Sequence, residues 1–168
     1  MMKTRNRIIL TGFVLLLAVS LIASTVYVTR FAAVQAGKDY TFYLGRSGIT
    51  FSKSQMSGIL RMQRRNTSVV PGPTSAPKFS GNLLDVRFVD NKGAVVTAIK
   101  GPVSVSFILA GPTRNLWTTG LLSIYYYQPW HNSWIKCPTY LAGSTATTIT
   151  LGCNISNFGL YGVGVGFK

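Results

Sequence analysis

Apolar and polar positions alternate along short segments of this chain, and turn residues separate the segments. The clearest alternation runs from Val103 to Leu109, between Gly-Pro pairs at 101–102 and 111–112. A period of two predicts strands that bury one face, and Gly-Pro pairs end strands because proline lacks a backbone donor. We therefore expect a fold built from short strands.

Further β-prone segments follow the same rhythm, at 40–44, 49–51, 83–89, 94–99, 121–128, 133–136, 147–153 and 160–167. Two pairs of them predict hairpins, because Asp90–Gly93 and Pro129–Asn132 have the composition of turns. No long helical period follows residue 65. Regularly spaced short strands indicate an all-β fold, and we expect an antiparallel sandwich of immunoglobulin-like architecture in preference to a barrel.

Composition suggests four regions along the chain. Residues 37–65 are interpreted as a basic transitional segment, with one or two short strands and then an amphipathic helix or turn over 52–65. Residues 66–80 are rich in proline and hydroxyl side chains, which predicts a linker. The sandwich domain is then expected at 81–168, and residues 1–36 form a leader.

The leader contains a membrane-targeting signal. Three basic residues among the first seven precede an uncharged run from Ile8 to Thr29. As a helix this run would be about 33 Å long, enough to cross a bilayer as a signal anchor, and the positive-inside rule places the later residues outside. A cleaved signal peptide is the alternative, because Val34-Gln35-Ala36 places small residues before Gly37. The chain is expected at the cell membrane, single-pass with its C-terminal domain outside, or secreted.

The charge is strongly unbalanced. The chain has 17 lysines and arginines against three acids, a net charge of +14. Such a field attracts anionic polymers and surfaces, although it also serves solubility alone. Within 52–65 the residues Arg61, Arg64 and Arg65 are candidate contacts to an anionic polymer or to lipid headgroups, and a solvated charged face is the alternative interpretation.

Catalytic and metal-binding patterns do not emerge. With His131 as the single histidine and three scattered acids, we identify no carboxylate pair or triad, so we expect no enzyme and no cofactor. Cys137, Cys153 and His131 are one ligand short of a structural zinc set. In an oxidising compartment the two cysteines predict a disulfide, with two buried free thiols as the alternative.

Aromatic residues gather near these cysteines: Tyr125, Tyr126, Tyr127, Trp130 and Trp134. They are able to stack on sugar rings or on bases, with cations nearby. Strand alternation sends about half of such residues inward, so packing in the core is the favoured interpretation.

A further pattern spans the C-terminal third: Leu122–Tyr127, Trp134, Pro138–Thr139, a threonine-rich strand and Asn157–Tyr161. It resembles the C-terminal half of the ZU5-like and GAIN-like β-sandwich modules of surface and signalling proteins. Self-cleaving members of that group use a serine or threonine as nucleophile and a histidine as base. Gly159 and Asn157 stand in those positions, so the resemblance implies a non-cleaving structural or interaction module.

Two functions follow from the sequence. The first is a non-enzymatic extracytoplasmic module for cell-surface structure or protein interaction, attached to the membrane through its N-terminal helix. The second is a basic adhesive module for anionic polymers such as cell-wall polymer, acidic polysaccharide or extracellular DNA. The salt dependence of binding distinguishes the two functions, because screening weakens charge-driven binding far more than apolar contact.

Overall fold

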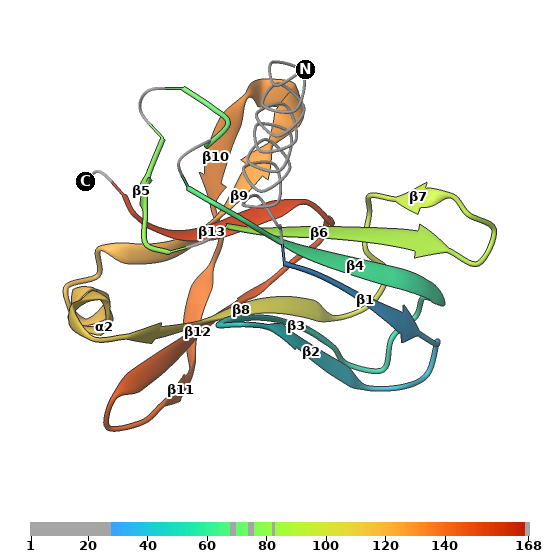
Figure 1. The fold of residues 1–168 in the computed structure, drawn as a ribbon, viewed down its shortest axis with the longest axis horizontal. Helices are drawn as coiled ribbons and strands as arrows, with labels where there is room; N and C mark the ends of the chain where they lie inside the picture. Colours follow the sequence, from blue (N-terminus) through green and yellow to red (C-terminus); the bar gives the residue numbers. More distant parts are fainter. Residues whose placement is uncertain (1–27, 68–69, 74–75, 82, 167–168) are drawn as a thin grey trace, which may run out of the picture.

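Two antiparallel β-sheets pack face to face in the computed structural model, which describes residues 28–166 apart from 68–69, 74–75 and 82 (Figure 1). The expected all-β sandwich is confirmed. The helix expected over residues 8–29 falls almost entirely outside the described residues. Within the described part, no helix is long and apolar enough to cross a membrane.

Sheet A is the upper layer in Figure 1, and sheet B is the lower layer. Sheet A contains, in spatial order, β1 (Thr29–Val34), β4 (Gly58–Arg65), β6 (Leu83–Asp90), β13 (Leu160–Val165), β9 (Leu122–Gln128) and β10 (Ser133–Lys136), with the short β5 (Lys78–Phe79) on β13 and β7 (Val95–Val96) on β6. Sheet B contains β11 (Thr139–Ser144), β12 (Thr148–Asn154), β8 (Val103–Ala110), β3 (Ser47–Phe51) and β2 (Tyr40–Leu44). Helix α2 (Pro112–Thr118) follows β8, and the 3-10 turn η1 (Pro129–His131) joins β9 to β10.

The core lies between the sheets and follows the alternation in the sequence. In β8 the side chains of Val103, Val105, Phe107 and Leu109 are buried. Aromatic contacts join the layers, because the ring of Phe51 in sheet B lies 6.3 Å from that of Phe88 in sheet A, centroid to centroid. Each fully buried side chain of this kind stabilises the fold by about 1.5–3 kcal/mol.

Residues 37–65 are part of this sandwich, so their assignment to a segment preceding it is wrong. Strands β2 and β3 extend sheet B beyond β8, and β4 lies in sheet A between β1 and β6. The amphipathic helix or turn expected over 52–65 is instead an irregular stretch to Ser57 followed by β4, in which Leu60 and Met62 are fully buried. The apolar Ile59 points outward and hides the period of two, which explains why the sequence favoured a helix.

The proline-rich segment 66–80 also differs from expectation, because it connects two neighbouring strands of one sheet. Its described residues lie between the end of β4 and the start of β6, and Pro71 and Phe79 contact the face of sheet A that turns away from sheet B. The Trp134 indole donates a hydrogen bond to the Pro71 carbonyl at 2.7 Å, and the ring of Phe79 lies 4.3 Å from that of Trp134. The segment is therefore a cover for sheet A, and the sandwich does not begin at residue 81.

Strand β1 comprises residues that the sequence assigned to the leader. It forms one edge of sheet A and pairs with β4 at six positions, from Thr29 opposite Gln63 to Val34 opposite Gly58. The side chain of Val34 is buried in the core. A cleavage after Ala36 would remove this strand from the sandwich.

Candidate functional site

The three arginines singled out in the sequence do not form one patch. They lie near the end of β4, where successive side chains point to opposite faces of the sheet. Arg61 and Arg65 project from the outer face of sheet A, the face that turns away from sheet B. Arg64 projects to the other side, where it lines a pocket with Arg46.

Arg87 joins the outer-face arginines, because it lies opposite Arg61 in the pairing of β4 with β6. The carboxylate of Asp85 accepts from Arg65 Nη2 at 2.5 Å, and it lies 3.5 Å from Arg87 Nη2. The Asp85 side chain is only 7% exposed, whereas both guanidinium groups reach solvent. One buried carboxylate thus orients two guanidinium groups, an arrangement that sequence analysis missed because strand pairing creates it.

A cleft of about 490 Å³ opens beside these ion pairs. It lies between the β6–β7 and β9–β10 hairpins, and we call it the hairpin cleft. Its lining includes Arg65, Asp85, Arg87, Val95, Tyr126, Tyr127, Trp130, Asn157 and Phe158. Trp130 stands in η1 at the tip of the β9–β10 hairpin with 79% of its surface exposed. The hairpin cleft therefore combines guanidinium groups with an exposed aromatic ring.

The structure separates the five aromatic residues of the sequence analysis into two sets. Tyr125 and Trp134 pack against Phe79 under the 66–80 segment. Tyr126 packs against the core and contacts Tyr161, with ring centroids 5.1 Å apart.

Tyr127 and Trp130 form the second set, because both line the hairpin cleft and neither packs against the core between the sheets. The Tyr127 hydroxyl donates to Asn132 Oδ1 at 2.7 Å, which fixes the ring at the cleft wall. Of these five residues, Tyr126 packs against the core as expected, whereas Tyr125 and Trp134 are covered on the outer face by the 66–80 segment. Tyr127 and Trp130 remain open to a ligand.

Burial raises the pKa values of three tyrosines, of which Tyr126 lines the hairpin cleft. The pKa of the Tyr161 hydroxyl is raised well above its usual range by burial and secondarily by Tyr126. Burial also raises the pKa values of Tyr125 and Tyr126. The charged side chains that line the hairpin cleft are those of Arg65, Arg87 and Asp85.

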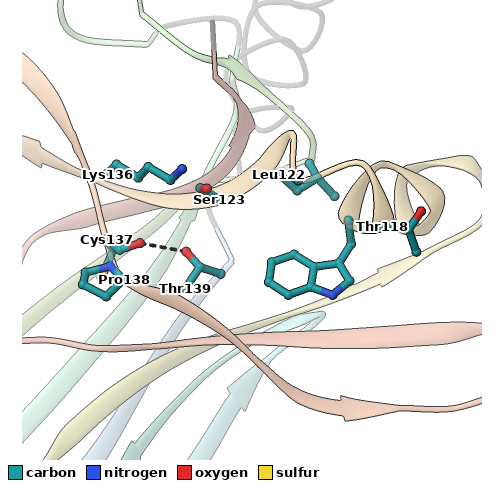
Figure 2. A pocket seen from close by; sticks show the side chains of 9 residues that line it. Thr118, Leu122, Ser123, Lys136, Cys137, Pro138 and Thr139 are labelled. Atoms are coloured by element: carbon teal, nitrogen blue, oxygen red, sulfur yellow. Dashed lines mark hydrogen bonds between the residues drawn. The ribbon is translucent and has the colours of Figure 1, made fainter. Parts of the chain in front are cut away.

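A second pocket, of about 650 Å³, lies between α2 and the ends of β9 and β10. Figure 2 shows Leu122, Ser123 and Lys136 along one side and Pro138 and Thr139 below them. The Thr139 hydroxyl donates to the Cys137 carbonyl at 2.8 Å and fixes the chain where it leaves sheet A. Lys136 is the single charged residue of this lining, so the pocket has less to offer an anionic ligand than the hairpin cleft.

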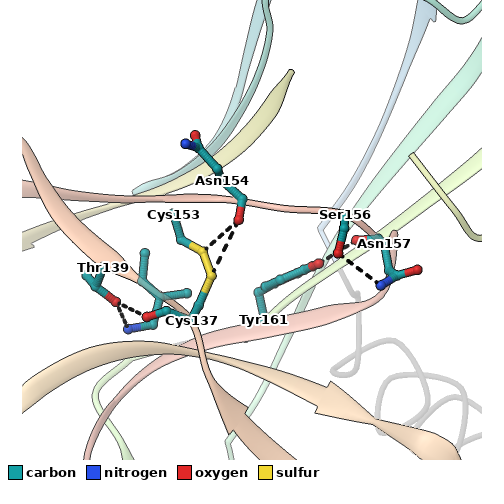
Figure 3. The surroundings of a disulfide bond; sticks show 8 residues. Cys137, Thr139, Cys153, Asn154, Ser156, Asn157 and Tyr161 are labelled. Atoms are coloured by element: carbon teal, nitrogen blue, oxygen red, sulfur yellow. Dashed lines mark hydrogen bonds between the residues drawn. A yellow bond between two sulfur atoms is a disulfide. The ribbon is translucent and has the colours of Figure 1, made fainter. Parts of the chain in front are cut away.

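The expected disulfide is confirmed, and it joins the two sheets (Figure 3). Cys137 lies in the link from β10 to β11, Cys153 lies in β12, and their Cα atoms are 6.2 Å apart. The Asn154 carbonyl oxygen lies 3.1 Å from the Cys153 sulfur. The disulfide occupies both cysteines, and in the described part of the chain no group of three or more His, Cys, Asp or Glu is placed to hold a metal ion.

Comparison of the chain with protein-family models and with curated proteins gave no match. The resemblance to ZU5-like and GAIN-like modules stays a prediction. Of the two positions that it singled out, Asn157 and Gly159 both line the hairpin cleft.

Proposed function

We propose that this protein is a non-enzymatic, extracytoplasmic β-sandwich of the cell surface that binds acidic polysaccharide in the hairpin cleft. The observation that carries the proposal is the combination of Trp130 with the guanidinium groups of Arg65 and Arg87 in one cleft. The exposed indole offers a flat apolar surface to a sugar ring. The two guanidinium groups are suited to the carboxylates of a uronic acid, because their donors match a carboxylate in pairs.

The charge distribution supports an anionic ligand. Thirteen of the basic residues and all three acids lie in the described part, a net charge of +10. Asp85 is committed to two arginines, so it neutralises only one of the two positive charges at the hairpin cleft. The ligand would meet a positive field on approach as well as in the cleft.

The proposed location is the outer side of a membrane, with the uncharged run that begins at Ile8 as a retained anchor that ends before β1. A disulfide is stable in oxidising compartments, which supports an extracytoplasmic sandwich. Retention is supported by β1, because cleavage after Ala36 would expose the core where Val34 is buried. We further propose an immunoglobulin-like or ZU5-like connectivity for the sandwich.

The test is binding of the full chain, kept in a non-ionic detergent, to immobilised alginate across a salt gradient. Alginate carries carboxylates on every ring, and neutral dextran and single-stranded DNA serve as comparison polymers. We expect retention on alginate, loss of retention with rising salt, and no retention on dextran. Equal retention on DNA and alginate would show attraction by charge alone and would contradict a sugar site.

Matched variants test whether alginate binding depends on the hairpin cleft or only on the overall positive charge. Arg87→Ser and Lys38→Ser each remove one positive charge, but Lys38 lies in the β1–β2 turn away from the cleft. Arg87→Ser and Trp130→Ala should each weaken alginate binding about tenfold, while Lys38→Ser should change it about twofold or less. Equal losses from Arg87→Ser and Lys38→Ser would rule out the cleft as the site.

Protein contact is the second candidate function, and an exposed apolar row favours it. Ala33, Ile59, Val89 and Val95 lie in register across four strands on the outer face of sheet A. Phe31 stands beside the row with 67% of its surface exposed, and Val95 is 70% exposed. Contiguous exposed apolar residues are typical of protein-binding surfaces. Phe31→Ser would weaken such a contact without affecting alginate binding.

A further inference from the structure

The opening between the sheets forms a separate pocket, with a volume of about 490 Å³. We call it the arginine mouth. Sheet B contributes the β2–β3 turn and the end of β8, and sheet A contributes the end of β4. The residues used below are Gly45, Arg46, Ser47, Arg64, Ser80 and Thr113.

The arginine mouth contains two cations and no acid. Among the described residues, no carboxylate pairs with Arg46 or Arg64, since the ion pairs there are those of Asp85 on the outer face. Asp39 accepts from a backbone N–H at 2.6 Å, and Asp90 caps its own turn. Two guanidinium groups in one pocket repel each other, and a bound anion would remove that repulsion.

The remaining lining suits a tetrahedral oxyanion. The Arg64 Nη1 atom lies over the turn at Gly45, where an added Cβ would be 3.2 Å from it. Ser47 is buried at the wall, and the Ser80 hydroxyl donates to the Thr113 hydroxyl at 3.3 Å. Guanidinium groups donate in pairs and hydroxyl groups add single donors, so several oxygens of one phosphate can be satisfied together.

The arginine mouth lies next to the point where the chain enters the sandwich. The backbone N–H of Arg64 donates to the Val28 carbonyl at 3.0 Å. The Arg30 guanidinium donates to the Tyr43 carbonyl at 2.7 Å, which joins β1 to β2 across the same opening. If the uncharged run before β1 spans the membrane as proposed, the arginine mouth lies at the level of the lipid headgroups.

We propose that the arginine mouth binds a phosphate ester, supplied by the headgroup of an anionic phospholipid. The phosphate would lie between Arg46 and Arg64 and would hold the sandwich in one orientation against the membrane. The phosphate site itself is independent of the hairpin cleft, and only its lipid source rests on the proposed anchor.

The test is calorimetric titration of the full chain in non-ionic detergent at constant ionic strength. One arm uses soluble short-chain phosphatidylglycerol, and the other uses inorganic phosphate. The variant Arg46→Gln with Arg64→Gln removes both cations of the site. The control Lys38→Gln with Arg61→Gln removes the same charge elsewhere, and Arg61 lies on the opposite face of β4. Circular dichroism confirms that both variants fold.

We expect the site variant to weaken phosphatidylglycerol binding at least about tenfold, and the control to change it about twofold or less. Tighter binding of the lipid than of inorganic phosphate supports the headgroup as the source. Equal affinities overturn the lipid source and assign the site to a soluble phosphate ester. No saturable binding by the parent chain, or equal losses in the two variants, overturns the site. None of these outcomes depends on alginate binding, so the cleft proposal stands or fails separately.

Discussion

The two halves of the outer face of sheet A differ in what covers them. Over β13, β9 and β10, the 66–80 segment covers the face: its Phe79 packs on Tyr125 and Trp134, and its Pro71 carbonyl accepts from Trp134. Over β1, β4 and β6, the described chain leaves arginines and apolar side chains exposed. The hairpin cleft lies at the border between the two halves.

This contrast shows that side-chain type alone does not identify a binding surface. Trp134 and Trp130 lie four residues apart and both look suited to a sugar. The cover makes Trp134 part of the stabilising structure, whereas Trp130 stands at a hairpin tip and contributes nothing comparable to the core. A ligand is therefore expected at the exposed ring of Trp130, and not at Trp134 beneath the 66–80 segment.

Replacing the aromatic residue that holds the cover should have the largest effect. Trp134→Ala removes the contacts with Phe79 and Tyr127 and the hydrogen bond to Pro71. We expect a loss of about 3–5 kcal/mol in the free energy of unfolding, measured by urea denaturation. The matched Trp130→Ala change should alter it by about 0.5 kcal/mol or less. Similar losses in both variants would contradict the division of the face into two halves.

Removing the disulfide should have a somewhat smaller effect. The bond spans 16 residues and ties the covered half of sheet A to sheet B through Cys137 and Cys153. Replacing both cysteines by serine should lower the free energy of unfolding by about 3 kcal/mol. Reduction of the parent chain with dithiothreitol is the control and should give the same loss. If the reduced parent unfolds at the same urea concentration as the oxidised one, the bond does not stabilise the sandwich.

The sequence predicted the strand-rich fold, the two hairpins and the disulfide, because local alternation and turn chemistry encode them. It missed β1 and β4, where apolar residues such as Phe31 and Ile59 point to solvent and mask the alternation. It also missed the cover, because nothing local in 66–80 shows that Pro71 will meet Trp134.

The site was predicted less completely than the fold. Proximity in sequence grouped Arg64 with Arg61 and Arg65, although a strand sends neighbours to opposite faces. The contribution of Arg87 depends on its register with β4, which a single sequence does not define.

The buried acid of the open half provides a third, smaller test. Asp85→Asn removes the charge that orients Arg65 and Arg87, both of which can turn to solvent instead. We expect a loss of about 1 kcal/mol in the free energy of unfolding, since pairs this exposed are screened by water. Alginate binding should change in affinity and in salt dependence, because the cleft gains a net positive charge. A loss of stability without any change in the salt dependence of alginate binding would show that Asp85 has no role in the binding site.

The smallest expected effect concerns Phe31 of the open half, compared with Phe79 of the covered half. Phe31 is 67% exposed on edge strand β1, so Phe31→Ser gives up little buried surface and should change the free energy of unfolding by about 0.5 kcal/mol or less. Phe79→Ser should cost several times more, because that ring packs on Trp134 and Tyr125. Urea denaturation of the two variants side by side measures the difference. A large loss from Phe31→Ser would mean that the open half is closed in solution by a further contact, and concentration-dependent sedimentation would then show whether a second copy of the chain supplies it.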